Sequence, residues 1–217
     1  MLKADLHVHT EYSMDCSTPL AEIVRRCGEV GISCLAVADH GTVEGALRLQ
    51  AMAPFRVIVA EEILTPDGEI MGMFLKETIP SGSSLAETIS RIKAQGGLVC
   101  IPHPFDLYRQ ALGGRIPADL IPQVDIVEVL NARGLLPRAT AKARAFAAKH
   151  GLAQSAGSDA HTAAEIGNAF VEMPEYDGRQ DFLAALAQGR VGGHKTSPTV
   201  HFASTWTRLK KRFNGGQ

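Results

Sequence analysis

Residues 2–10 read LKADLHVHT and residues 32–39 read ISCLAVAD, and these two stretches decide the fold class. In the first stretch, apolar and polar residues alternate, which is the pattern of a strand with one buried face. The second is a short apolar run, as in a strand that is buried on both faces. Between them, residues 20–27 place apolar side chains at helical spacing. A strand, a helix and a second strand in this order predict a parallel β-α-β unit.

The alternation in the first stretch assigns a face to each side chain. We expect four apolar side chains to share one face: Leu2, Ala4, Leu6 and Val8. The opposite face then carries Lys3, Asp5, His7 and His9. Two histidines separated by one residue are therefore expected to point the same way from the end of the first strand.

Strand and helix patterns continue to alternate along the chain. Residues 56–65 and 70–76 flank a Pro-Asp-Gly turn, which predicts a hairpin. Further strands are expected at 98–102, 124–130 and 152–157, and further helices at 42–53, 84–96 and 137–150. The predicted fold class is α/β with a mostly parallel sheet in a single domain. Periodicity alone leaves open whether this sheet closes into a barrel.

The composition limits the class of protein. Lys and Arg number 22 against 23 Asp and Glu, a formal net charge of −1, which argues against a polycation that coats nucleic acid. No apolar run approaches the ~20 residues of a membrane-spanning helix. The first residues, MLKADLHVHT, are unlike a signal peptide. Four cysteines without a CxxC pair indicate a reducing compartment, so we expect a cytoplasmic protein.

Polar side chains gather where the predicted strands end. In chain order they are Asp5, His7, His9, Asp39, His40, Glu61, Glu62, His103, Glu128, Asn131, Asp159 and His161. In parallel α/β folds, ligands bind at the carboxyl ends of the strands. Five of the eight histidines fall on this rim, whereas the other three (His150, His194 and His201) have an ordinary structural interpretation.

The pattern on this rim predicts metal binding. A single histidine in a strand is more often a hydrogen-bonded core or surface residue, but five on one rim favour a ligand cluster. Imidazole and carboxylate groups without cysteine suit Zn²⁺, Mn²⁺ or Fe²⁺ at a catalytic site. So many ligands indicate more than one ion. Paired metal ions make a hydroxide nucleophile from water and hold the oxygens of a phosphoryl group.

The chain resembles the PHP (polymerase and histidinol phosphatase) domain family in six ordered motifs: ADLHVHT at 4–10, SMD at 13–15, ADH at 38–40, EEI at 61–63, PHPFD at 102–106 and GSDAHT at 157–162. It is most similar to the short stand-alone bacterial members, which are metal-dependent phosphoesterases. The resemblance implies a distorted (β/α)7 barrel over residues 1–200, followed by a basic tail at 201–217. It also implies a centre of two or three metal ions that hydrolyses phosphate esters.

Carried over by position, the resemblance assigns the ligands of three ions. The first ion would be held by His7, His9, Glu62 and Asp159. Glu62, rather than Glu61, would also bridge to a second ion held by His103. A third ion would be held by Asp15, His40 and His161. Many family members have a histidine for the second ion in the hairpin strand, but here Ile70 and Met71 occupy that stretch, so two ions are as plausible as three. Asp5 is expected to orient a ligand histidine.

These assignments lead to a mechanism and to alternatives. We expect a metal-bound hydroxide to attack phosphorus, with Asp159, His161 and His40 as catalytic residues and a proton passed to the leaving group by His161 or His40. Arginine holds phosphate in a bidentate manner, and the expected substrate-binding residues are Arg133, Asn131, Arg109 and Arg115. The substrate would be a small phosphorylated metabolite or nucleotide. The alternatives are a nuclease with the same centre and a non-catalytic metal-binding domain.

Overall fold

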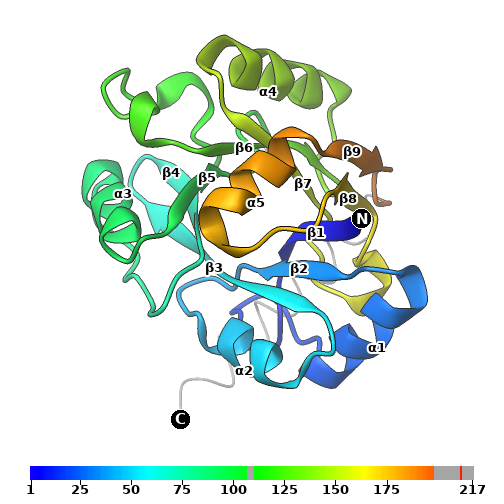
Figure 1. The fold of residues 1–217 in the computed structure, drawn as a ribbon. Helices are drawn as coiled ribbons and strands as arrows, with labels where there is room; N and C mark the ends of the chain where they lie inside the picture. Colours follow the sequence, from blue (N-terminus) through cyan, green and yellow to red (C-terminus); the bar gives the residue numbers. More distant parts are fainter. Residues whose placement is uncertain (107–109, 198–210, 212–217) are drawn as a thin grey trace.

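The structure, a computed structural model, describes residues 1–106, 110–197 and 211. Strands and helices alternate along most of the chain (Figure 1). The strands are β1 (Leu2–Val8), β2 (Cys34–Val37), β3 (Arg56–Thr65), β4 (Gly68–Met73), β5 (Leu98–Ile101), β6 (Ile126–Asn131), β7 (Ala153–Gly157), β8 (Ala169–Met173) and β9 (Arg190–Gly193). The α-helices are α1 (Leu20–Val30), α2 (Glu44–Met52), α3 (Leu85–Ala94), α4 (Pro137–His150) and α5 (Gly178–Ala187). Short 3-10 turns occupy Gly113–Arg115, Ile121–Gln123 and Ala163–Glu165.

The strands form one sheet in the order β7-β6-β5-β4-β3-β2-β1-β8-β9. Neighbouring strands from β1 to β7 are parallel except for β4, which is antiparallel to both β3 and β5 because the hairpin turn reverses the chain. Two antiparallel strands, β8 and β9, extend the sheet beyond the amino half of β1. The predicted α/β class and the predicted hairpin are therefore confirmed.

The sheet closes into a barrel where its first and seventh strands meet. The backbone N–H of Asp159 donates to His7 O at 2.7 Å, and that of His9 donates to Ala160 O at 3.0 Å. These bonds join the segment after β7 to the carboxyl end of β1, while β8 pairs with the amino end of β1. The result is the distorted (β/α)7 barrel that the resemblance implied, and the open alternative is wrong.

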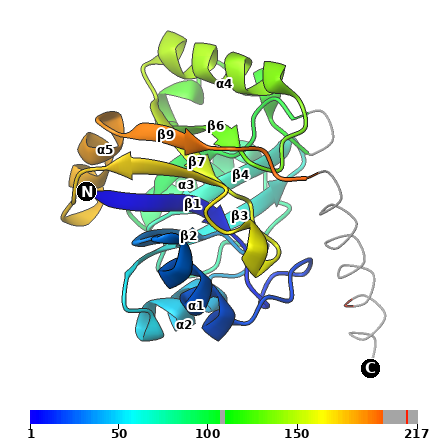
Figure 2. The same cartoon turned by 90° about the vertical axis from the view of Figure 1, so that its right-hand side faces the viewer.

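Helices surround the barrel and close one end of it. The helices α1, α2, α3 and α4 lie around the outside, whereas α5 lies across the amino end of the strands (Figure 1). In Figure 2, β1 runs from the amino terminus on the left toward the right, and α5 lies on the left. Phe182 and Leu186 of α5 are buried against side chains of the barrel interior. The helix α5 thus covers the amino end of the barrel interior.

Two apolar cores hold the barrel together. The inner core lies inside the barrel and includes many small side chains from the strands: Ala4, Cys34, Ala36, Ala60, Cys100 and Ala156. The outer core lies between the strands and the surrounding helices, with Ile23, Leu49 and Ile89 on the helical side. Small side chains are needed inside because a barrel of this size leaves little internal width. The free thiols of Cys34 and Cys100 therefore serve as small apolar groups.

Two helices end or begin at the residues that the sequence predicted. Gly31 ends α1 in the left-handed conformation, with φ of 71°. Ser84 caps α3 by accepting a hydrogen bond from the N–H of Glu87 at 3.3 Å. The strands β8 and β9 and the helix α5 were not predicted, because their sequence has weak periodicity. None of the described helices is long and apolar enough to cross a membrane, and the cytoplasmic location stays a prediction.

The basic tail expected at 201–217 lies outside the described residues except for Lys211. The Nζ of Lys211 donates to the carbonyl oxygens of Glu11 and Ser13, at 2.6 and 2.7 Å, in the loop between β1 and α1. The predicted domain boundary near residue 200 thus stays a prediction.

Candidate metal centre

All eight side chains that we expected to hold metal lie at the carboxyl end of the barrel. They come from β1, β3 or the loops after β1, β2, β5 and β7: His7, His9, Asp15, His40, Glu62, His103, Asp159 and His161. Seven of them are buried, and the side chain of His40 is 14% exposed. The structure thus gathers these groups into one site that is largely removed from water.

An irregularity in β1 aims the first two histidines into the barrel. The register between β1 and β2 shifts between Asp5 and Val8. Before the shift, Leu6 packs in the inner core, and after it Val8 packs in the outer core. Strict alternation would place both on one face, so our expectation for Val8 was wrong. A bulge of this kind re-aims the side chains that follow it, and it brings His7 and His9 to the inner side together with Leu6.

The first cluster consists of two imidazoles and two carboxylates. The Nε2 atoms of His7 and His9 lie 3.2 Å apart. Glu62 Oε2 lies 3.3 Å from His7 Nε2 and 3.5 Å from His9 Nε2. Asp159 Oδ1 lies 3.3 Å from His9 Nε2 and 3.9 Å from His7 Nε2. Each of these two carboxylate oxygens therefore lies within 4 Å of both imidazole nitrogens.

The second cluster contains a residue that sequence reasoning missed. His103 Nε2 lies 2.7 Å from Glu62 Oε1 and 3.7 Å from Oε2 of Glu69, a residue of β4. One ligand atom from each of these three residues lies within 4.8 Å of the other two. A usable signal existed in the alternation of β4, because Glu69 shares a strand face with Met71 and Met73, which lie in the inner core.

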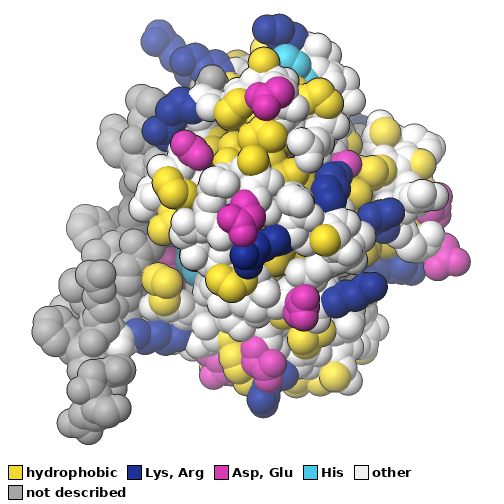
Figure 3. Space-filling view, turned by 90° about the vertical axis from the view of Figure 1, so that its left-hand side faces the viewer, with side chains coloured by type: hydrophobic (Ala, Val, Ile, Leu, Met, Phe, Trp, Pro, Cys, Tyr) yellow, Lys and Arg dark blue, Asp and Glu magenta, His cyan; other side chains and the backbone are white. Residues whose placement is uncertain are grey.

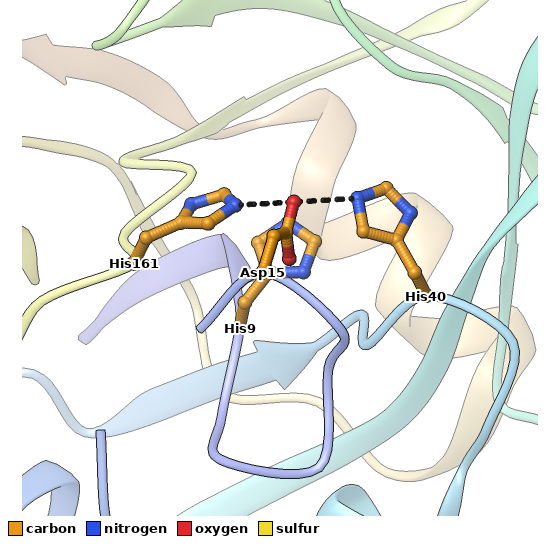
Figure 4. Close-up of side chains that lie close together, drawn as sticks. All are labelled: His9, Asp15, His40 and His161. Carbon is orange, nitrogen blue, oxygen red and sulfur yellow. Dashed lines mark ion pairs between the residues drawn. The ribbon is translucent and has the colours of Figure 1, made fainter. Parts of the chain in front are cut away.

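The third cluster is arranged around Asp15 (Figure 4). Asp15 Oδ2 lies between two imidazoles, 3.4 Å from His40 Nε2 and 3.1 Å from His161 Nε2. Ser13 Oγ donates to the other carboxylate oxygen at 2.8 Å. The fourth member is His9, which also belongs to the first cluster. One imidazole thus connects the first and third clusters.

Glu62 lies close to a histidine of each of the three clusters. Its Oε1 faces His103, whereas its Oε2 faces His7 and also lies 3.6 Å from His40 Nε2. The neighbouring Glu61 points away, and its Oε2 accepts a hydrogen bond from the N–H of Ile79 at 2.8 Å. Burial raises the pKa of Glu61 to about 7. The geometry therefore separates the two glutamates as we expected, with Glu62 toward the centre.

Polar residues around the clusters hold the ligands in place. Glu128 Oε1 lies 3.1 Å from His7 Nδ1, and Glu128 Oε2 accepts the N–H of His103 at 2.7 Å. Asn131 Nδ2 donates to Glu128 and to Asp159 Oδ2, each at 3.0 Å. Both N–H bonds of this amide are used inside the protein. Asn131 thus holds these two carboxylates in place, and its contact with substrate stays a prediction.

Asp5 does not orient an imidazole, contrary to our expectation. Its carboxylate accepts backbone N–H bonds from Ser158 at 2.8 Å and from Gly167 at 2.9 Å. The only link to a ligand histidine is a 3.4 Å bond from the backbone N–H of His7. Asp5 thus fastens the segment after β7 to β1, and Glu128 orients His7.

Two candidate ligands have unusual backbone conformations. Among the non-glycine residues that the structure describes, positive φ values occur at Phe74 (60°), His103 (26°) and Asp159 (55°). Such conformations cost energy and persist where the surroundings determine them strongly. Their occurrence at His103 and Asp159 indicates that the fold holds these two side chains toward the centre at the expense of local stability.

The buried groups of the centre shift one another's pKa values. Burial alone would raise the pKa of Glu62, but the charges of His7 and His103 hold it well below its ordinary value. Burial would lower the pKa of His7, but Asp159 and Glu62 raise it well above 6.5. Burial and the charge of His9 lower the pKa of His161 to about 4. Because metal ions compete with protons for these atoms, ion binding would replace the bound protons.

The donor set fits divalent metal ions. Around a tetrahedral ion with bonds of about 2.0–2.2 Å, ligand atoms stand roughly 3.3–3.6 Å apart. Most of the separations among His7, His9, Glu62 and Asp159 are close to this range. Two imidazole nitrogens that face each other at 3.2 Å share at most one hydrogen bond, whereas an ion between them would use both lone pairs.

The expected substrate-binding arginines have different surroundings. Arg133 is buried, its Nε lies 3.4 Å from Glu165 Oε1, and its charge helps to lower the pKa of His161. Arg115 donates to the carbonyl oxygens of Leu112 and Ala111 in its own loop. Arg109 lies outside the described residues. Of the two arginines that the structure describes, Arg133 is the one that lies at the centre.

A lysine that the sequence did not single out also borders the centre. Lys195 Nζ donates to Asn131 O at 2.9 Å. It lines a small cavity together with His103 and Glu128. Burial lowers the pKa of Lys195. This lysine is a second cation beside the metal-ligand clusters.

The carboxyl end of the barrel carries linked clusters of histidine and carboxylate side chains. This arrangement is that of a class of proteins, the metal-binding α/β barrels. The chain belongs to the PHP family within this class. The family model of the PHP domain matches residues 5–62, and the PHP-associated model matches residues 137–191. The first match includes five of the eight expected ligands and ends within β3, the hairpin's first strand.

The chain also has relatives of substantial sequence identity. Two uncharacterized proteins of Methanocaldococcus jannaschii align with the chain. One is 41% identical over 144 residues, which make up 60% of this chain and 82% of the relative. The other is 34% identical over 178 residues, or 80% of this chain and 71% of the relative.

Three solved structures share the fold at low identity. A two-domain protein of Bacteroides vulgatus, which contains a predicted PHP-like metal-dependent phosphoesterase, superposes with a TM-score of 0.73 at 17% identity, covering 89% of this chain and 65% of that one. PsfC of Pseudomonas syringae gives 0.67 at 17% identity, covering 96% and 98%. A lesion-specific endonuclease of Pyrococcus furiosus gives 0.62 at 16% identity, covering 88% and 57%. The chain thus spans just under two thirds of the Bacteroides protein.

Proposed function

We propose that the chain is a metal-dependent phosphoesterase that hydrolyses a small phosphorylated metabolite or nucleotide. One observation carries this proposal: the two oxygens of Glu62 face different ligand clusters, so that ions held in them would be neighbours. Neighbouring divalent ions at such a centre lower the pKa of water and neutralise the negative charge of a phosphoryl group. Membership in the PHP family supports the same reaction class.

The protein's own residues would have distinct tasks in this reaction. Asp159 and His161 hold the centre's geometry, since both follow β7 and Asn131 fixes the Asp159 carboxylate. His40 is the most exposed of the eight expected ligands. Burial would lower its pKa, but the hydrogen bond with Asp15 raises it to about 9. If two ions are bound and His40 is not a ligand, His40 is suited to keep a proton at Nε2 and to pass it to a leaving oxygen.

Two cations would bind the non-reacting oxygens of the phosphate. Arg133 offers a planar guanidinium next to His161, and Lys195 offers an ammonium group in the cavity beside His103. Arg109 and Arg115 remain predicted contacts from the loop before β6. The expected ions are Mn²⁺, Zn²⁺ or Fe²⁺, two or three in number, because imidazole and carboxylate ligands accept each of them.

A nuclease is the second candidate, since the Pyrococcus furiosus endonuclease shares the fold. Non-specific nucleic-acid binding requires a positive groove or stacking aromatics. Figure 3 shows one side of the molecule, where Lys and Arg alternate with Asp and Glu instead of gathering in one patch. A non-catalytic metal-binding domain is the third, and the nearly complete ligand set argues against it.

The test compares the purified protein on a phosphate monoester, a phosphodiester and a short oligonucleotide. Each assay is run with Mn²⁺, with Zn²⁺ and with a chelator. Metal-dependent turnover of the monoester is the expected result. Preference for the oligonucleotide would establish the nuclease instead, and no turnover on these or on a panel of nucleotides would favour the non-catalytic domain.

Removal of metal is expected to lower thermal stability. A ligand that binds only the folded state stabilises it by about 2.7 kcal/mol when its concentration is about 100 times the Kd. Several buried ligands would otherwise face one another with only protons between them. Calorimetric melting with saturating Mn²⁺ and with excess chelator measures the difference. Equal Tm values in the two conditions would contradict metal binding at the folded centre.

A further inference from the structure

Glu69 belongs to a candidate ligand cluster, but the family resemblance does not assign it. In its place, many family members have a histidine from the hairpin strand, and this chain has none in β4. The side chain of Glu69 is 15% exposed, and it faces His103 across the barrel rim. A carboxylate therefore lies where the second cluster would otherwise lack a third protein ligand.

The backbone fixes the position of this carboxylate. Glu69 pairs with Leu64 across the hairpin. On its other side, the N–H of Glu69 donates to Gln110 O at 2.7 Å, and Glu69 pairs with Ala111. Gly68 permits this approach, because a Cβ there would lie 2.7 Å from Gln110 O. The residue is thus held from both sides by backbone bonds and is not a flexible surface side chain.

The local charges call for a cation between these side chains. His103 Nε2 is close to one oxygen of Glu62 and to one oxygen of Glu69. One oxygen of each carboxylate lies within 4.8 Å of the other, and negative groups at this separation repel. A divalent ion would accept electron pairs from all three groups at once. Its ligands would then be two carboxylates and one imidazole.

We propose that Glu69 is the third protein ligand of the second ion and that it raises the affinity of this site for Mn²⁺ relative to Zn²⁺, compared with a histidine in its place. Carboxylate oxygens suit Mn²⁺, whereas imidazole suits Zn²⁺. Replacing an expected imidazole by a carboxylate shifts the preference accordingly. The inference rests on the proposed function in one respect, because it requires that the centre binds metal.

The test measures metal binding itself and does not depend on a substrate. Metal-free protein is dialysed against Mn²⁺ alone, and the bound ions are counted by elemental analysis while calorimetry gives their affinities. E69Q is expected to bind one Mn²⁺ fewer than the wild type. The affinity of that ion should fall by more than about 100-fold, because losing a direct ligand exceeds the 10–100-fold loss typical of a supporting residue. E77Q is the matched control, since Glu77 is exposed and distant from the clusters.

A second variant tests the choice of metal. E69H is expected to recover the lost ion with Zn²⁺ but not with Mn²⁺, and so to raise the Zn²⁺-to-Mn²⁺ affinity ratio of that site. It also keeps the test valid if E69Q fails to fold. Equal numbers and affinities of Mn²⁺ in wild type and E69Q would overturn the role of Glu69 while leaving the proposed function intact. A wild-type protein that binds neither metal would overturn the proposed function as well.

Discussion

Replacing Asp159 is expected to abolish metal-dependent hydrolysis while the fold is kept. Asp159 Oδ1 faces His9, and its Oδ2 is held by Asn131. The Asn variant is the sharpest test, because residue 159 has a positive φ that asparagine tolerates better than alanine. Loss of an ion that contributes several kcal/mol to the transition state would lower kcat on the order of 10³-fold.

The experiment for Asp159 needs three measurements. Activity and bound metal are determined for Asp159→Asn and His9→Ala, and circular dichroism checks the fold. Asp119→Asn, an exposed carboxylate in the loop before β6, serves as the control and should behave as the wild type. Full activity with full metal content in either site variant would show that these side chains are not ligands.

Replacing Gly157 by alanine is expected to disrupt the barrel seam, which is the contact between β1 and the segment after β7. A Cβ at this position would lie 2.3 Å from His7 Cβ and 2.7 Å from His7 N. Because the nearest atoms include backbone, no change of rotamer relieves the clash. Overpacking in a rigid interior costs about 1–3 kcal/mol, and more where neighbours cannot move. We expect a loss of about 3 kcal/mol in the free energy of unfolding, together with loss of metal.

A second glycine provides the matched control for this prediction. Gly28 lies in α1, where a Cβ would meet nothing within 4 Å. Gly28→Ala should raise the free energy of unfolding by about 0.5–1 kcal/mol, since alanine is the better helix former. Denaturant unfolding with and without Mn²⁺ measures both variants. A Gly157→Ala protein with the stability and metal content of the wild type would refute the close approach at the seam.

Periodicity predicts the fold class, but it does not predict that the sheet closes into a barrel. The alternation of β1, the apolar run of β2 and the turn after β3 each depend on residues close together in sequence. Whether the barrel closes depends on backbone bonds between Asp159 and His7, which are far apart in the chain. Local patterns contain no information about such a pairing, and the motif resemblance supplied it.

The candidate site could likewise be predicted from the sequence only in part. Position at a strand end was enough to nominate His7, His103 and Asp159, because parallel strands bring these ends together. It was not enough for the bulge in β1, which arises from pairing with β2 and reverses the face of Val8. Position at a strand end also did not reveal that the Asn131 amide donates a hydrogen bond to Asp159, because hydrogen-bond partners depend on side-chain packing.

The seam between β1 and the segment after β7 has a consequence for how the protein comes to be assembled. Ser158 and His7, which share a hydrogen bond at 3.5 Å, are 151 residues apart. Contacts of such high sequence separation form late in folding. At about 5–20 residues per second, a ribosome needs on the order of ten seconds to supply the second half of the seam.

During that interval the ligand histidines of β1 lack Asp159, so a complete first cluster cannot exist on the nascent chain. An ion at the first cluster would therefore gain Asp159 as a ligand only when the barrel closes, and it would then crosslink the two ends of the fold. In the finished protein the amide hydrogens of His9 and Asp159 lie in this crosslinked seam. Their exchange with solvent should report the departure of the ion before any helix unfolds.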